Sequence, residues 1–224
     1  MPAEKKPPRR TAERIVEVSL ELFNRFGEPN VSTTLISAEM GISPGNLYYH
    51  FPAKEDLVNV LVDRYRTRMA EILPAAAAVR DVEDAWLLMH LWLETNGQYR
   101  FVLRDLDDLL SRNRHLETQV GALLRDADRA LRAMLEGLAR EGALQLPSGE
   151  AAPLATSMGV LLTYWLSHAY VRDPRHALEP SHAAATLAGG VQQALHLLRP
   201  YLQPAQREHL DRLAAAGHGQ APGR

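Results

Sequence analysis

The sequence predicts an all-α protein, with an N-terminal three-helix domain of the helix-turn-helix type followed by a C-terminal helical domain. Apolar residues recur at three- and four-residue steps through nearly the whole chain, which is the periodicity of amphipathic helices. Glycine and proline clusters separate these segments, as expected at helix ends. No alternating pattern long enough for a β-strand interrupts them.

The first domain is predicted over residues 11–57. Residues 1–10 are basic and proline-rich, and we expect them to form a disordered tail because they offer nothing to bury. A helix then begins at Thr11, carries Ile15, Leu22 and Phe26 on one side, and ends at Gly27.

Two short helices follow, and their caps define them. Thr33 or Thr34 is expected to cap the first, which runs to Met40 before the break at Gly41. Ser43 is expected to cap the second, with Pro44 in its first position, where no backbone N–H is needed. A longer connecting helix is predicted over residues 54–73.

The second domain is predicted over residues 80–216, after a boundary at Pro74 and the alanine run that follows it. We expect its helices near residues 81–97, 100–111, 114–142, 151–172, 181–199 and 203–216.

Composition narrows the classes of function. The chain of 224 residues is 46% hydrophobic and 23% charged, which is typical of a globular protein, and it contains no cysteine. No apolar run approaches the roughly 18 residues of a membrane span, so no membrane partner is expected. The net charge of −2 argues against a chain that coats nucleic acid along its length, but the basic N-terminus favours an anion-binding surface there.

The predicted helix over residues 43–51 has the chemistry of a DNA-reading helix. Leu47 and Phe51 are expected in the core, while the remaining side chains are small, polar or aromatic with a polar tip, and include no carboxylate. Gly45 permits close backbone approach to the groove, and Asn46 can hydrogen-bond a base edge. Tyr48, Tyr49 and His50 can reach phosphates or a thymine methyl, although one of the two tyrosines could serve mainly in packing. Lys54, together with the hydroxyl groups of Thr33 and Thr34, could contact phosphates.

Residues 11–57 resemble the DNA-binding domain of the TetR family of transcriptional regulators. The matching stretches are Ala12-Glu13-Arg14-Ile15, Leu22-Phe23-Asn24-Arg25-Phe26-Gly27, Ser32 through Ser43, and Gly45 through Leu57. The resemblance implies contact with double-stranded operator DNA for Thr33, Ser43, Gly45, Asn46, Tyr48, Tyr49, His50 and Lys54. Many members carry a lysine after the capping serine, where this chain has Pro44, so one basic contact is missing.

The resemblance also implies that the second domain is a C-terminal helical ligand-binding and dimerisation domain, and that the homodimer reads a palindromic operator. Two helices near the C-terminus, about residues 154–170 and 182–198, are rich in small and apolar residues and are the predicted dimer helices. The alternative is that these small residues line a core within one chain. The stretch from Tyr99 to Leu106, with Asn113 to Leu116, resembles one subgroup of TetR-like regulators.

Large residues at helical spacing in the second domain are the predicted effector contacts, although such stripes also occur in ordinary cores. Because they are mostly apolar, we expect a lipophilic or aromatic small-molecule effector. These residues are Trp86, Met89, His90, Leu93, Met134, Met158, Leu162, Trp165 and His168.

Other functions have little support in the sequence. His90 and Glu94, or His168, Asp173, His176 and His182, could pair by chance, and no metal-ligand spacing occurs, so neither a metal nor a cofactor is predicted. No catalytic motif is present, and we predict that the chain is not an enzyme. The leading interpretation is a ligand-responsive bacterial repressor, located in the cytoplasm and on the nucleoid when bound. A protein-binding module and a helical enzyme are the competing hypotheses.

Overall fold

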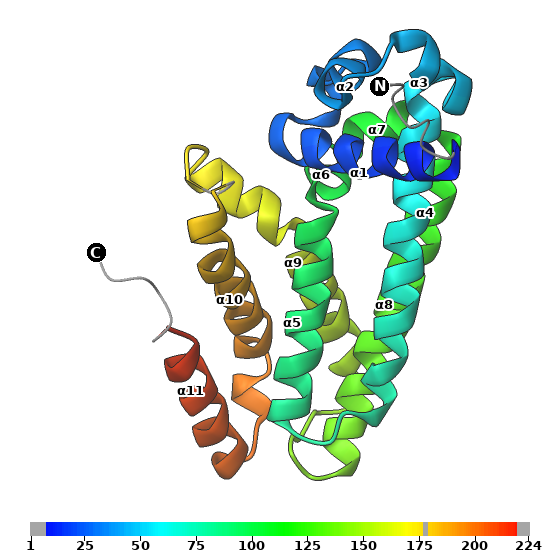
Figure 1. The fold of residues 1–224 in the computed structure, drawn as a ribbon. Coiled ribbons are helices and arrows are strands. Elements are labelled where there is room, and N and C mark those ends of the chain that lie inside the picture. Colours follow the sequence, from blue (N-terminus) through cyan, green and yellow to red (C-terminus); the bar gives the residue numbers. More distant parts are fainter. Residues whose placement is uncertain (1–7, 177–178, 219–224) are drawn as a thin grey trace. The chain divides into compact units, whose positions relative to one another are not determined.

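The computed structural model describes residues 8–176 and 179–218, and almost all of them lie in helices (Figure 1). In this part of the chain, Leu144 and Leu202 form an isolated β-bridge and no strand occurs, so the predicted all-α class is confirmed. Residues 1–7 of the predicted disordered tail lie outside the described residues. The first helix begins at Pro8, so residues 8–10 are helical and not part of a tail.

The helices follow the predicted order, with one clear difference. The predicted helix over 100–111 is two short helices, because the backbone leaves the α-helical conformation at Asp105. The elements are α1 (Pro8–Phe26), η1 (Glu28–Asn30), α2 (Thr33–Met40), α3 (Pro44–His50), α4 (Lys54–Ile72), η2 (Leu73–Ala78), α5 (Val82–Gln98), α6 (Arg100–Arg104), α7 (Leu106–Arg112), α8 (Arg114–Arg140), α9 (Ala151–Arg172), α10 (Pro180–His196), η3 (Arg199–Tyr201) and α11 (Pro204–His218).

The chain forms two compact units whose limits differ from the predicted domain limits. Unit 1 comprises residues up to Tyr65 together with Tyr99–Gln119, and unit 2 comprises Arg66–Gln98 and the residues from Val120 onward. Residues 99–119, predicted within the second domain, therefore belong to the compact unit that contains the helix-turn-helix. Helices α4 and α8 each contain residues of both units.

In unit 1, α1 packs against α2 and α6, and α2 packs against α3. The core is built from fully buried side chains, among them Ile15, Phe23, Ile36 and Leu47. The rings of Phe23 and Phe101 lie 5.3 Å apart, which joins α1 to α6.

Two arginines of α6 donate hydrogen bonds to carbonyl groups at the C-terminal end of α1. The last carbonyl groups of a helix have no partner within that helix. Arg104 donates to the carbonyl of Phe23 (2.8 Å) and to that of Asn24 (3.3 Å), and Arg100 also donates to Asn24 (3.1 Å). Burial, and to a lesser degree the charge of Arg104, lowers the pKa of Arg100. The backbone turns directly afterwards at Gly27, whose φ of 88° favours glycine.

In unit 2, α5 packs against α9, α10 and α11, and α9 packs against α10 (Figure 1). Gly190 allows α10 to approach closely, because a Cβ there would lie 2.6 Å from the ring of Trp165. The Trp165 indole donates to the carbonyl of Thr186 (2.7 Å), which fastens α9 to α10. The loop after α8 is joined by backbone hydrogen bonds to the end of η3, through Gln145 N–H to Tyr201 O (2.8 Å), and to the segment after η3, through Gln203 N–H to Ala143 O (3.0 Å).

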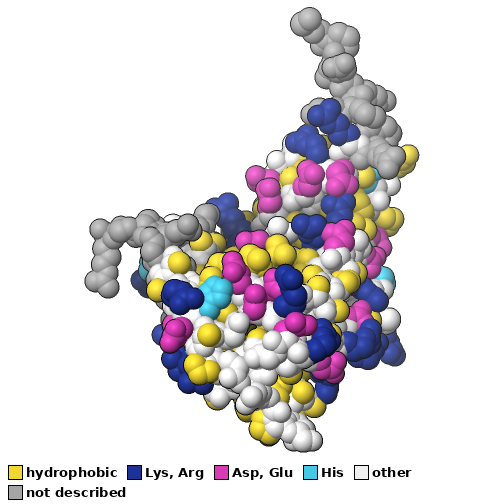
Figure 2. Space-filling model, turned by 90° about the horizontal axis from the view of Figure 1, so that it is seen from below, with side chains coloured by type: hydrophobic (Ala, Val, Ile, Leu, Met, Phe, Trp, Pro, Cys, Tyr) yellow, Lys and Arg dark blue, Asp and Glu magenta, His cyan; other side chains and the backbone are white. Residues whose placement is uncertain are grey.

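Figure 2 shows a face on which Lys and Arg side chains alternate with Asp and Glu, with apolar side chains between them. On this face, the described residues form no broad area of one charge sign. Among the described helices, none is both long enough and apolar enough to cross a membrane.

Candidate nucleic-acid interface

Helix α2 begins with a side-chain cap one residue before the predicted one. The Ser32 hydroxyl accepts a hydrogen bond from the N–H of Leu35 (3.1 Å), so neither Thr33 nor Thr34 is the cap. Ser32 is preferred because its backbone is extended, whereas Thr33 is already helical. Thr33 and Thr34 therefore occupy the first helical turn, where backbone N–H groups have no acceptor within the helix.

The turn between α2 and α3 depends on Gly41. Its φ of 63° is left-handed, a conformation that places its N–H near the carbonyls of Ser37 and Ala38. Ile42 then donates to the carbonyl of Ser37 (3.0 Å), which closes the end of α2. The chain leaves the turn in the direction that starts α3.

Helix α3 has the predicted cap and the predicted anchor. Ser43 accepts from the N–H of Asn46 (3.2 Å), Pro44 occupies the first turn, and Leu47 is fully buried. Phe51 ends the helix and is only half-buried, so its predicted place in the core is wrong: it lies at the C-cap, beyond the buried face.

The outward face of α3 is exposed and free of acidic side chains. Gly45, Asn46 and Tyr48 are exposed, Tyr49 is 79% exposed, and His50 is half-buried with its ring against that of Tyr49 (5.2 Å). Tyr48 forms a hydrogen bond with Thr33 (2.9 Å between Oη and Oγ1). Of the two tyrosines, Tyr49 is therefore the one more available to an external partner.

A shallow groove of about 520 Å³ lies between the start of α2 and the start of α4. It brings together Thr33, Tyr48 and Lys54, three of the residues predicted to contact DNA. Its lining is completed by Pro29, Asn30, Val31, Ser32, Pro52 and Ala53. Thr34, Ser43, Gly45, Asn46, Tyr49 and His50 are not part of this lining.

Lys54 is engaged within unit 1. Its ammonium nitrogen lies 2.9 Å from the Glu28 carboxylate, and it donates to the carbonyls of Glu28 (3.0 Å) and Val31 (3.1 Å). The two carbonyl contacts are hydrogen bonds, whereas the contact with the carboxylate is an ion pair, because the buried Glu28 Oε1 has no hydrogen-bond partner.

Glu28 and Arg112, which are not among the residues predicted from the sequence to be functional, hold Lys54 in this position. Glu28 is fully buried, and its carboxylate pairs with Lys54 and, through a short contact, with Arg112 of α7. Arg112 also pairs with Asp108 (2.9 Å), and the backbone N–H of Glu28 donates to Asp105 (2.8 Å). Burial by itself would lower the pKa of Arg112, but its hydrogen bonds to Glu28 and Asp108 outweigh burial and raise it.

The subgroup pattern over Tyr99–Leu106 and Asn113–Leu116 includes one member of this network, Asp105, but neither Asp108 nor Arg112. Besides Arg100 and Arg104, it includes Asn113, which donates to Asn59 of α4 (2.8 Å) and accepts from the N–H of Leu116. His115 of the same stretch lies 2.7 Å from Asp63 of α4. The pattern therefore marks residues that fasten unit 1 together.

In unit 2, most of the residues predicted to contact an effector lie in the core. These are Met89, Leu93, Met134, Met158 and Leu162, each at most 1% exposed. Helical spacing could not separate cavity-lining from core positions, because both face inward. Trp86 and His90 are half-buried and stacked 3.6 Å apart, Trp165 packs between α9 and α10, and His168 is exposed.

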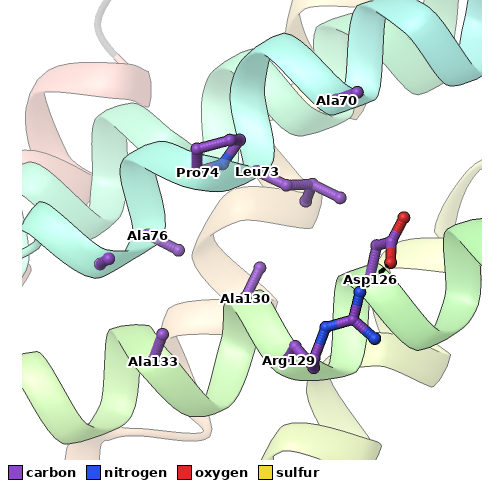
Figure 3. Close-up of a pocket in the computed structure, with 9 residues that line it drawn as sticks. Ala70, Leu73, Pro74, Ala76, Asp126, Arg129, Ala130 and Ala133 are labelled. Carbon is purple, nitrogen blue, oxygen red and sulfur yellow. Dashed lines mark hydrogen bonds and ion pairs between the residues drawn. The ribbon is translucent and has the colours of Figure 1, made fainter.

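Two surface grooves lie in unit 2, and none of those nine residues lines either. In Figure 3, residues of α4 and η2 face residues of α8 across a groove of about 350 Å³, with the Asp126–Arg129 ion pair at one side. The second groove, about 210 Å³, lies between α8 and α9 and is bordered by Leu124, Val160 and Tyr164. Over residues 8–176 and 179–218, no group of three His, Asp or Glu side chains could hold a metal ion.

Helices α1, α2 and α3, of which α2 and α3 are short and α3 is exposed and free of acidic side chains, define a helix-turn-helix of the DNA-reading type. Comparison with known proteins agrees. Residues 15–61 match the family described as "Bacterial regulatory proteins, tetR family", and residues 64–210 match "Bacterial transcriptional repressor", the TetR C-terminal family. The chain belongs to the TetR family of bacterial transcriptional regulators, as its sequence predicts.

Individual relatives give the same assignment. HTH-type transcriptional regulators of Staphylococcus aureus strains are 37% identical over 60 residues, which is 27% of this chain. That match spans about a third (32%) of the curated relatives' length. A TetR-family transcriptional regulator of Marinobacter aquaeolei VT8 is 28% identical with a TM-score of 0.79, covering 92% of this chain and 98% of that one. A TetR-family regulator of Agrobacterium tumefaciens, 23% identical, shares the fold (TM-score 0.67; 88% and 100% covered).

Proposed function

We propose that this protein is a ligand-responsive repressor that binds a palindromic operator as a homodimer in the bacterial cytoplasm. The observation that carries the proposal is the exposed, acid-free face of α3, on which Gly45, Asn46 and Tyr49 are presented by a helix capped by Ser43 and anchored by the buried Leu47. Asn46 offers the amide that pairs with adenine, and Tyr49 offers a hydroxyl to a phosphate or a base edge.

The surface of α9 supports the homodimer. Val160 is 56% exposed, Tyr164 47% and Val171 77%, although large apolar side chains are costly to leave in water. Several residues of α10, including Ala184 and Ala185, are small and exposed, so a second copy could approach closely. We propose that α9 and α10 of the two copies pair about a twofold axis, which would place two α3 helices about 34–36 Å apart on DNA.

For the effector, the half-buried Trp86–His90 pair is the strongest remaining support in unit 2. Its tilted rings provide an aromatic surface on which His90 Nδ1 is already paired with the carbonyl of Trp86 (3.0 Å); the other polar atoms of the pair are His90 Nε2 and the Trp86 indole nitrogen. We propose a lipophilic or aromatic effector. Its coupling to DNA binding would amount to about 1–3 kcal/mol, as in other allosteric proteins. Helix α4 is the proposed route, since it contains residues of both units.

Selection of genomic fragments followed by footprinting tests the proposal. The full-length protein should recover a site with twofold symmetry, and Asn46→Ala should weaken binding to it by about 1–3 kcal/mol, the value of a good base contact. Asn46→Ala should leave binding to random-sequence duplex unchanged. Absence of any sequence preference at physiological salt would refute the proposed function.

A further inference from the structure

A single segment of unit 1 contacts the chain on both sides of the groove in which Thr33 and Tyr48 lie. The segment runs from Arg104 through α7 to Asn113, and it includes the break at Asp105 that separates α6 from α7. Its first residues contact η1 and its last residue contacts α4. Both of these elements supply residues that line the groove.

The contact with η1 is made by the Asp105 carboxylate. One of its oxygens accepts a hydrogen bond from the backbone N–H of Glu28 (2.8 Å), and the carboxylate also pairs with Arg104 (Nε to Oδ1, 3.2 Å). Both side chains of this ion pair are only 14% exposed. Arg104 in turn donates to the carbonyls at the end of α1. Asp105 therefore holds the first residue of η1 against the end of α1, across the turn at Gly27.

The contact with α4 is made by Asn113. Its side chain donates to Oδ1 of Asn59 (2.8 Å) and accepts the N–H of Leu116 (2.8 Å), so it caps α8 and joins that end of α8 to α4. Asn113 is 3% exposed, and a buried amide that loses a partner is costly. Asn59 lies in the second turn of α4, shortly after Lys54, which lines the groove. The start of α4 is therefore held from the same segment that holds η1.

These contacts bear on the groove because its two walls begin at η1 and at α4. From η1 the chain passes directly through Val31 and Ser32 into α2, and these residues line one wall. Lys54, at the start of α4, lines the other. Phosphate contacts fix a protein in register on the duplex, so the groups on the two walls have to be held at a matching distance. A shift of η1 or of α4 would change that distance.

We propose that Asp105 and Asn113 are positioning residues of the DNA interface. They set the distance between the start of α2 and the start of α4, and they do not touch DNA. Both lie outside residues 15–61, which match the family of DNA-binding domains. DNA binding by this protein therefore depends on a segment that the helix-turn-helix itself does not include. The inference rests on the proposed function in DNA binding.

Two variants each remove one of the contacts. Asp105→Ala removes the acceptor of the Glu28 N–H, and Asn59→Ala removes the acceptor of Asn113 but leaves Asn113 to cap α8. Each should weaken binding to the footprinted duplex by about 2- to 30-fold, the range for residues that act on a site without touching its ligand. The matched control is Asp107→Ala, because Asp107 is an exposed acid of the same segment.

The sign of the effect separates positioning from charge. Removing an acid makes the potential around a DNA-binding domain more positive, which favours DNA. Asp107→Ala should therefore bind DNA as tightly as the wild type or slightly more tightly. Asp105→Ala removes the same charge but should bind more weakly, as should Asn59→Ala, which removes no charge. Urea denaturation identifies conditions in which every variant is folded, and the affinities are compared there.

A distance measured in the free protein is a second readout, which a loss of stability alone would not change. The chain has no cysteine, so nitroxide labels can be attached at two exposed positions, through Thr34→Cys on α2 and Glu55→Cys on α4. Mixing with an excess of unlabelled protein restricts the measurement to the pair within one copy. Electron paramagnetic resonance should show a shifted or broader distance distribution with Asp105→Ala or Asn59→Ala, and the wild-type distribution with Asp107→Ala.

The outcomes that contradict the proposal are separate from those that contradict DNA binding. Unchanged binding, or an unchanged distance distribution, with either Asp105→Ala or Asn59→Ala overturns the positioning role of the residue whose contact that variant removes. If Asp105→Ala does not fold, Asn59→Ala and its comparison with Asp107→Ala still decide the question. A wild-type protein that binds neither a selected nor a random-sequence duplex would contradict the proposed function itself.

Discussion

At the scale of single residues, Ser32 and Ser43 cap the starts of α2 and α3 in the same way. Each hydroxyl accepts an N–H from the third residue beyond it, at 3.1 and 3.2 Å. Ser43 differs in its setting, because it begins the helix whose outward face is proposed to read DNA. Its cap therefore contributes both to folding and to the direction of α3.

Substitutions of Ser43 should separate capping from charge. Ser43→Ala should lower the stability of the protein by about 0.5–2 kcal/mol, and Ser43→Asn should restore most of that loss because asparagine is also a good cap. Ser43→Asp should restore stability but weaken DNA binding, since it adds a negative charge at the interface. Urea denaturation and DNA titration measure the two effects; equal DNA affinity of the Asn and Asp variants would contradict this assignment.

Local chemistry explains which residues could be predicted. The Ser43 cap, the Gly41 break and the buried Leu47 follow from neighbouring residues, so the sequence predicts them. The partner of Lys54 could not be predicted in the same way, because Glu28 is 26 residues away and Arg112 lies on α7. The cap of α2 was predicted at Thr33 or Thr34, one or two residues too late, because Ser32, Thr33 and Thr34 all carry hydroxyls.

At the scale of elements, α6 and α7 have a role that helical periodicity does not reveal. Together with Asn113, which lies between α7 and α8, they supply Arg100, Arg104 and Arg112; these four residues contact α1, η1 and α4. Their apolar spacing predicts helix, but only the fold shows that they belong to unit 1. The residues predicted to contact an effector show the same limit of helical periodicity in unit 2, because their buried Met and Leu side chains fill the core.

Two glycines of α8 provide a matched pair of tests. A Cβ at Gly137 would lie 2.4 Å from the carbonyl oxygen of Val79, so Gly137→Ala should destabilise the protein by about 1–3 kcal/mol. At Gly121 the nearest atom is the end of the Arg125 side chain at 3.5 Å, and Gly121→Ala should stabilise by about 0.5–1 kcal/mol through helix propensity. Thermal unfolding should show opposite shifts in Tm; shifts of the same sign would rule out this account.

At the scale of the whole molecule, the proposed dimer can be tested through one exposed valine. Val160→Glu would bury an unpaired carboxylate if α9 forms the interface, and should weaken dimerisation at least about 100-fold. Leu87→Glu on α5 is the control, because Leu87 is similarly exposed (52% against 56%) but lies outside α9 and α10. Sedimentation velocity would distinguish monomer from dimer. A Val160→Glu protein that remains dimeric would exclude this part of α9 from the interface.

The capping of α1 by α6 also bears on how such proteins can be recombined. The arginines that satisfy the last carbonyls of α1 lie 76 to 81 positions further along the chain, and between them and α1 the chain passes through unit 2. A segment cut after Tyr65 would lose the arginine donors to the carbonyls of Phe23 and Asn24, and the buried Glu28 would lose Arg112 and keep only Lys54 of its two cationic partners. Natural or engineered exchange of DNA specificity between regulators of this kind would therefore have to transfer two separate stretches of sequence together.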